Sequence, residues 1–236
     1  MTNNNISYER YNRQMLLKDF GEAGQQKLMN AKVLVVGAGG LGCPVLQYLT
    51  AAGVGNIGVV DDDVVALTNL HRQILFSVDD IGYPKVEIAI QKLKKLNPDI
   101  NLTAFNERLN VENAIDIISQ FDLVVDGSDN FGTRYLVNDA CALLNKTLVY
   151  GAVSQYEGQV AVFKTTNYRD LFPDPPADGE IQNCAEAGVL GVLPGIIGAL
   201  QANEALKLIT GIGDALADRV LTYNSLDNQV YETQIS

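Results

Sequence analysis

A set of polar side chains suited to phosphate and metal chemistry occurs within the first 130 residues of the chain. These side chains are the cations Arg72 and Lys85, the amide Asn69 and the carboxylate Asp129. Cations balance the charge of phosphate groups, and carboxylate oxygens are ligands that Mg²⁺ prefers. The combination suits a triphosphate with Mg²⁺ better than a nicotinamide, which needs a flat and largely apolar slot.

A glycine-rich turn precedes these residues. In "KVLVVGAGGLG" an apolar run leads into Gly37, Gly39, Gly40 and Gly42, and Asp61 follows about twenty residues later. This is the dinucleotide fingerprint, in which the glycines cradle phosphate and the acidic residue binds ribose. Taken alone, the turn leaves open whether the ligand is NAD or another nucleotide.

The predicted strands bring these residues to one place. Ligands of an open parallel sheet bind at the carboxyl ends of its strands. Asp61 and Arg72 follow the second predicted strand, Asp129 and Asn130 follow the fourth, and Lys85 lies early in a predicted helix. Each has a simpler interpretation, as a turn cap, a surface charge or a helix N-cap. Their convergence on one sheet edge favours a ligand site.

The elements that position the site alternate between strand and helix. Strands are predicted at 32–36, 56–61, 100–105, 122–130 and 147–153, and helices at about 41–52, 82–96, 111–120 and 130–144. A helical segment at 7–30 precedes them. Near-continuous Val, Leu and Ile in the strands predict an α/β fold, a Rossmann-like, mainly parallel sheet with helices on both faces.

The pattern changes after residue 150. Alternating residues at 158–165 and 219–232, with a hairpin turn at 223–229, predict antiparallel C-terminal strands that extend the sheet. Residues 165–183 are predicted to form a long exposed loop, and 192–210 a helix. We therefore expect one domain over 1–236, with a nucleotide-binding half at 31–150 and a second half at 151–236.

Composition excludes several classes of protein. The net charge is −11, which argues against broad binding to nucleic acid or anionic membranes. Cys43, Cys141 and Cys184 share no close spacing, so no disulfide or metal framework is expected, as suits the cytoplasm. The N-terminus is polar, and the longest apolar run, 187–200, is shorter than the ~20 residues of a membrane span.

Several segments resemble the ThiF/MoeB/HesA family, the bacterial relatives of ubiquitin-activating enzymes. They are "RYNRQ" at 10–14 and the segments 33–73, 82–87, 126–135, 158–163 and 183–211. The most specific part is the D-x-D…N-L-x-R-Q string that follows the glycines. The resemblance covers nearly the whole chain, and it implies that the glycine turn holds ATP.

The resemblance also implies an activity. Members adenylate the C-terminal glycine carboxylate of a small ubiquitin-like sulphur-carrier protein ending in Gly-Gly, and they release pyrophosphate. The pathway is left open between molybdopterin, thiamine and other sulphur chemistry. Residues 151–236 would form the carrier-binding half. By the matching positions, Gly40 and its neighbours contact the nucleotide, and Asp61 holds the ribose hydroxyls.

The remaining roles follow from the same match. Asn69, Arg72 and Lys85 would bind phosphates, Asp129 would hold Mg²⁺, and Arg13 would reach into the site of the other protomer of a homodimer. The single histidine, His71, occupies the variable slot of N-L-x-R-Q and is interpreted as incidental. A carboxylate nucleophile is already ionised, so the reaction needs positioning and charge stabilisation and no base.

The sequence departs from the family pattern in the second half. Many members bind structural zinc with two CxxC pairs, but here 167–170 reads Asn-Tyr-Arg-Asp and no second pair follows, so zinc is not expected. Without zinc, the loop at 173–179 is expected to be mobile. The end at "YETQIS" is consistent with a trimmed downstream domain, since some relatives continue into a rhodanese-like domain.

Cys184 matches a position where some relatives carry a cysteine that takes up a thioester or persulfide link. An ordinary loop cysteine is the alternative, and Glu180 and Glu186 nearby would raise the pKa of the thiol. Two rival functions are an NAD(P)-binding oxidoreductase, for which we find no substrate domain, and a non-catalytic carrier-binding member. A tRNA-modifying relative is disfavoured by the acidity of the chain.

Overall fold

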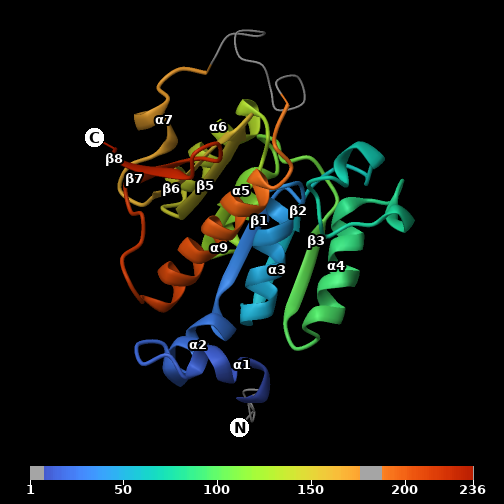
Figure 1. Ribbon diagram of the computed structural model, residues 1–236, viewed down its shortest axis with the longest axis vertical. Coiled ribbons are helices and arrows are strands. Elements are labelled where there is room, and N and C mark those ends of the chain that lie inside the picture. Colours follow the sequence, from blue (N-terminus) through green and yellow to red (C-terminus); the bar gives the residue numbers. More distant parts are fainter. Residues whose placement is uncertain (1–7, 176–187, 236) are drawn as a thin grey trace.

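The computed structural model describes residues 8–175 and 188–235, and these form a mixed eight-stranded sheet covered by helices (Figure 1). The strand order is β3-β2-β1-β4-β5-β6-β7-β8. The pairs from β3 to β5 are parallel, and those from β5 to β8 are antiparallel. The predicted Rossmann-like sheet with antiparallel C-terminal strands is thus confirmed.

The strands and helices have the following bounds. The strands are β1 Lys32–Val36, β2 Asn56–Val60, β3 Asn101–Phe105, β4 Leu123–Asp126, β5 Thr147–Ser154, β6 Glu157–Phe163, β7 Arg219–Asn224 and β8 Gln229–Gln234. The helices are α1 Tyr8–Met15, α2 Gly21–Asn30, α3 Gly42–Ala52, α4 Lys85–Leu96, α5 Ala114–Ser119, α6 Phe131–Leu143, α7 Tyr168–Leu171 and α9 Leu193–Thr210. Two 3₁₀ turns are η1 Leu67–Asn69 and η2 Val78–Asp80.

The central strand β1 shows why the sheet is covered on both faces. Val33 and Val35 pack into a core shared with α3, α4 and α9, which lie on one side of the sheet in Figure 1. Leu34 and Val36 point the other way, into a core shared with α5 and α6. Successive strand residues face opposite sides, so a strand that is apolar at every position must be buried on both.

The strand order reverses between β1 and β4, which are adjacent although two strands and the three α-helices α3, α4 and α5 intervene in sequence. In open α/β sheets this switch point leaves a crevice at the carboxyl ends of the strands. The glycine turn after β1 and the loop after β4 both open into it. Helices α1 and α2 lie at the other end of the sheet (Figure 1).

The prediction of a wholly exposed loop at 165–183 was wrong in its described part. Residues 168–171 form the short helix α7, and the side chain of Tyr168 is only 1% exposed. Asn167 and Asp170 close a capping box at its start, and the ring of Tyr168 contacts those of Tyr135 and Phe172, with centroids 5.0 and 4.9 Å away. This aromatic packing stabilises a segment whose composition is typical of a loop.

Element boundaries differ from the sequence expectations at two places. The N-terminal helical segment is two helices separated by residues 16–20, and Gly21, the first residue of α2, has a φ of +54°. The helix predicted from residue 82 begins at Lys85, because Gly82 has a φ of +88° and Pro84 is its N-cap residue. Within the described residues, none of the helices combines the length and apolarity that a membrane crossing requires.

Candidate functional site

The glycine turn between β1 and α3 is closely packed. Gly37 has a φ of +88°, and a Cβ atom on Gly42 would lie 1.9 Å from the carbonyl oxygen of Gly37. Only glycine therefore fits at residue 42, where the chain folds back to begin α3. The backbone N–H groups at the start of α3 consequently lie beside the crevice, which favours an anionic ligand there.

A cavity of about 280 Å³ occupies the crevice at the carboxyl ends of β1, β2 and β4. It is lined by eight of the residues singled out from the sequence, namely Gly37, Gly39, Gly40, Asp61, Arg72, Lys85, Asp129 and Asn130. The fold thus brings together in one cavity residues that are almost a hundred positions apart in the chain.

Two of the predicted site residues that the structure describes, Asn69 and Arg13, do not line this cavity. Asn69 ends the 3₁₀ turn η1, where its carbonyl oxygen accepts the N–H groups of Arg72 and Gln73, both at 3.0 Å. Asn69 therefore shapes the turn that carries Arg72. Arg13 is exposed on α1, at the end of the sheet opposite the cavity (Figure 1). Cys184 lies outside the described residues.

The carboxylate of Asp61 is held by the backbone on both sides. One oxygen accepts the N–H of Ala38 in the glycine turn at 2.7 Å, and the other accepts the N–H of Asp63 at 2.8 Å. The turn-capping interpretation of Asp61 is therefore realised, with lone pairs left for a ligand. Burial raises the pKa of this carboxyl above its usual range, and the nearby charge of Lys85 opposes the rise.

Lys85 is a buried cation with an exposed partner. The residue is 3% exposed, and its ammonium group lies 2.7 Å from the carboxylate of Asp63. The two residues are also joined through the backbone, because Lys85 donates its N–H to the carbonyl of Asp63 at 2.9 Å. The bridge between Val64 and Pro84 closes the same loop. The sequence did not indicate this pair, since 22 positions separate the two residues.

Arg72 has no carboxylate partner in the part of the chain that the structure describes. Its guanidinium donates to the carbonyl of Thr68 at 3.1 Å and lies 3.4 Å from the exposed ring of His71. A guanidinium whose charge is not balanced by the protein, on the wall of a cavity, is suited to bind phosphate oxygens.

The loop after β4 carries the predicted metal ligand. The carboxylate of Asp126 is buried and accepts the N–H of Ser128 at 2.9 Å, and burial raises the pKa of that carboxyl. Asn130 is the N-cap of α6 and accepts the N–H of Thr133 at 2.9 Å. Asp129, between them, is exposed and forms no hydrogen bond or ion pair with a described residue. Its oxygens are therefore available to a ligand.

A second acidic group lies in the same cavity. Carboxylate oxygens of Asp61, Asp62 and Asp63 lie within 4.8 Å of one another. Asp61 already binds the backbone and Asp63 already binds Lys85. This leaves Asp62 and Asp129 as exposed carboxylates of the cavity that bond to no described residue and are free to hold a cation.

Sequence reasoning missed Arg134, which also lines the cavity and is 7% exposed. It donates to the carbonyl of Ser128 at 3.2 Å, and its guanidinium lies 5.4 Å from the ring centre of Phe131 and 5.8 Å from that of Tyr150. These contacts fix the guanidinium beneath the loop after β4. The one available signal was a cation one helical turn after the Asp129–Asn130 cap.

Comparison with known proteins gives concordant results. A sulfur carrier protein adenylyltransferase of Thermus thermophilus is 54% identical over 227 residues, covering 93% of this chain and 84% of that protein. A probable adenylyltransferase/sulfurtransferase MoeZ of Mycobacterium tuberculosis is 48% identical over 92% of this chain. The chain spans 57% of the length of that relative and 51% of an adenylyltransferase and sulfurtransferase MOCS3 of Culex quinquefasciatus.

Among solved structures, E. coli MccB with MccA-N7isoASN has the same fold. The TM-score is 0.87 at 24% identity, over 99% of this chain and 73% of that one. The ThiF family is matched over residues 11–236. Together with the relatives that share about half of its sequence, this match confirms that the chain belongs to the ThiF family.

Proposed function

We propose that this adenylyltransferase activates the C-terminal glycine carboxylate of a small ubiquitin-like sulphur-carrier protein, using ATP and Mg²⁺ and releasing pyrophosphate. The observation that carries the proposal is one cavity in which a glycine turn faces two cations, Arg72 and Lys85, and the carboxylate of Asp129, which bonds to no described residue. The names of the relatives at about 50% identity support the same activity.

The residues of the cavity fit a magnesium–nucleotide complex. Among residues 8–175 and 188–235, Arg72 has no acidic partner to displace, and Lys85 lines the cavity. Asp129 offers carboxylate oxygens that no described residue occupies. We assign the phosphates to the two cations, the ribose to Asp61 and the metal to Asp129. When bound, Mg²⁺ would screen the negative charge of the phosphates from an approaching carboxylate.

In the proposed reaction, a carboxylate oxygen of the carrier's last glycine attacks the α-phosphorus of ATP. The bond from that phosphorus to the bridging oxygen breaks, and pyrophosphate leaves with the electron pair. Arg72 and Lys85 stabilise the charge that develops on the phosphate oxygens. No proton moves, which agrees with a cavity that the single histidine, His71, does not line.

We place the carrier's tail along the wall formed by the second half of the chain. Val153, Val189 and Pro194 line that side of the cavity and give it an apolar surface. A tail of two glycines has no side chains to accommodate, so a narrow and apolar path suits it. Residues 151–236 are accordingly proposed as the carrier-binding half. We do not propose nucleic acid or a membrane as a partner, since the chain carries a net charge of −11.

The first prediction tests this proposal against the two alternatives. With a carrier ending in Gly-Gly and Mg²⁺, the protein should exchange labelled pyrophosphate into ATP, and it should bind ATP more tightly than NAD. The same assay without carrier or without Mg²⁺ is the control. Tighter binding of NAD would favour an oxidoreductase, and carrier binding without exchange would favour a non-catalytic member.

The second prediction concerns zinc. The carboxylate of Asp170 accepts hydrogen bonds from the backbone and side-chain nitrogens of Asn167 at 2.7 and 3.0 Å, so both residues are engaged in the capping box of α7. Neither supplies the thiolate that structural zinc prefers. Metal analysis of the purified protein should therefore find far less than one zinc per chain. Stoichiometric zinc that resists chelation would contradict this.

The third prediction concerns the three cysteines. Cys43 and Cys141 are buried, and burial raises the pKa of each thiol to about 12. Neither should react with iodoacetamide in the native protein at about pH 8, because the thiolate is the reactive form. Mass spectrometry should find them modified only after unfolding. Any adduct formed by the native protein would then be assigned to Cys184.

Adenylation itself needs no thiol, so Cys184→Ala should leave pyrophosphate exchange within a few fold of wild type. We propose Cys184 as the residue that takes up any covalent link to the carrier. A reductant-sensitive carrier adduct, formed with ATP and lost in Cys184→Ala, would support this transfer role. Retention of the adduct in that variant would refute it.

A further inference from the structure

The side chain of Gln201, in the middle of α9, is fully buried and bonded to the sheet. Its Nε2 donates to the carbonyl of Asp126 at 2.7 Å and lies 3.5 Å from the carbonyl of Val149. Two carbonyl oxygens can only accept, so the orientation of this amide is fixed by its partners. Its Oε1 accepts no hydrogen bond from any described residue. A buried oxygen without a hydrogen bond destabilises the folded state, so packing alone would favour an apolar side chain at this position. The bond made by the amide nitrogen is what accounts for a glutamine here.

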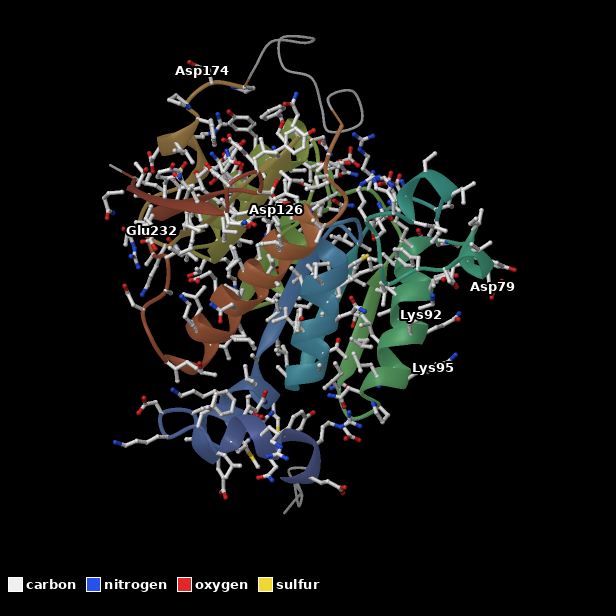
Figure 2. The ribbon with its side chains drawn as sticks, in the orientation of Figure 1. Asp79, Lys92, Lys95, Asp126, Asp174 and Glu232 are labelled. Atoms are coloured by element: carbon white, nitrogen blue, oxygen red, sulfur yellow. The ribbon has the colours of Figure 1, made fainter. Side chains whose placement is uncertain are left out.

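Gln201 bonds to Asp126, the residue immediately before the loop that carries Asp129. Asp126 ends β4, and Figure 2 shows it deep in the molecule, behind α9. Farther along the loop, Ser128 is held by the carboxylate of Asp126 and by Arg134. Asp129 itself forms no bond to a described residue. The position of its carboxylate therefore depends on the backbone of this loop.

The neighbouring strand makes room for the amide. A Cβ atom on Gly151 in β5 would lie 2.3 Å from the Cδ of Gln201. The first turn of α9 lines the nucleotide cavity with Pro194. One helix therefore forms a wall of the cavity and also fixes the strand end from which the loop at 127–130 begins.

We propose that Gln201 is a positioning residue, which sets the place of the Asp129 carboxylate by holding the carbonyl of Asp126 from α9. This inference rests on the proposed function, in which Asp129 binds the magnesium of the nucleotide complex. Strand pairing and the N–H of Gly127, which donates to the carbonyl of Val36 at 2.8 Å, still hold this end of the loop. Loss of the bond from Gln201 should therefore loosen the carbonyl of Asp126 and shift the Asp129 carboxylate relative to Arg72 and Lys85. Metal-dependent steps should suffer more than binding of the nucleotide alone.

The test uses Gln201→Met, which removes the donor while nearly keeping the volume. The Mg²⁺ concentration that half-saturates pyrophosphate exchange should rise about tenfold, as expected from the loss of one buried hydrogen bond of about 1.4 kcal/mol. Affinity for a non-hydrolysable ATP analogue without Mg²⁺ should change less than about twofold, since the bond does not touch the phosphate site. Amide hydrogen exchange should accelerate at residues 127–130.

Two further variants separate positioning from general loosening. Gly151→Ala displaces the amide without removing it, so it should also raise the Mg²⁺ concentration that half-saturates pyrophosphate exchange. Glu204→Gln is the matched control, because Glu204 is buried on the same helix and accepts the N–H of Leu216 at 2.8 Å, away from the loop. It should lower Tm and leave the Mg²⁺ requirement unchanged.

The outcomes distinguish the inference from the function on which it rests. Absence of Mg²⁺-dependent exchange in the wild type would refute the proposed function, and with it a metal role for Gln201. Wild-type exchange with an unchanged Mg²⁺ requirement in Gln201→Met would overturn the inference alone. An equal rise in Glu204→Gln at a matched loss of Tm would also overturn it.

Discussion

The substitution Asp129→Ala is expected to abolish carrier-dependent exchange of pyrophosphate into ATP, with a loss of about a thousandfold or more. Asp129 is exposed at the tip of the loop after β4, lines the nucleotide cavity and forms no bond within the described residues. Its removal should therefore cost little stability. The loss would come from the metal, because the proposed function assigns its carboxylate ligand to Asp129.

The matched control for this variant is Asp62→Ala. Asp62 lines the same cavity, is exposed and bonds to no described residue, so its removal changes the net charge of the site by the same amount. Exchange should stay within a few fold of wild type. If instead Asp129→Ala keeps near wild-type rates and Asp62→Ala does not, the metal is held by the acidic group at 61–63.

Lys85 and Asp61 show how far the sequence predicted the site. Both line the cavity, Asp61 because it follows the carboxyl end of the central strand β2 and Lys85 because α4 begins beside the same crevice. Their partners were not predicted. Asp63 reaches Lys85 only because the loop between them closes at Val64 and Pro84, a contact between residues far apart in sequence.

Buried polar residues were the main omission. Arg134 and Gln201 lie within segments that resemble the family, but the resemblance assigned a role to neither, and their helices read as ordinary amphipathic or apolar segments. Arg134 is stabilised by two aromatic rings and Gln201 by two carbonyl groups of adjacent strands. Such partners are assembled by the tertiary fold, so a pattern along the chain does not reveal them.

Tyr168 illustrates the same limit in the fold. It lies in a stretch rich in Asp, Asn and Pro, a composition typical of loops. The aromatic residues that bury it come from β5, β6 and α6 and from Phe172. The composition of the stretch predicts a loop, but packing of Tyr168 against these rings stabilises a short helix instead.

The second large effect on activity is expected from substitution of Arg13. This residue cannot reach the cavity of its own chain, so any role in the site would be in the site of a partner. Helix α1 is fixed at the far end of the sheet, where the hydroxyl of Tyr11 accepts from Asn97 at 2.8 Å and Arg10 donates to the carbonyl of Leu96 at 2.9 Å. Arg13 is exposed on this helix. We therefore keep the prediction that the protein is a homodimer in which Arg13 completes the partner's site.

Arg13→Ala and Asp129→Ala are each expected to be inactive alone and to restore activity when mixed. In a heterodimer of the two, one site has both its own Asp129 and an intact Arg13 from the partner. After equal mixing and full subunit exchange, half of the dimers are heterodimers, so about a quarter of wild-type exchange should return. Activity no higher than that of either variant, with exchange of subunits verified, would refute a role in trans.

The double variant Arg13→Ala Asp129→Ala, mixed with an equal amount of wild type, is the decisive control. If Arg13 acts in trans, both sites of each heterodimer are inactive. The site of the wild-type protomer lacks an arginine from its partner, and the site of the double variant lacks its own Asp129 carboxylate. About a quarter of wild-type activity then remains, from wild-type homodimers alone. If Arg13 acts within its own chain, the wild-type protomer of each heterodimer stays active and about half remains. The two mixtures contain the same substitutions in the same amounts, so about a quarter of wild-type activity in both indicates that Arg13 acts in trans, whereas no activity in the first and about half in the second indicates that it acts within its own chain.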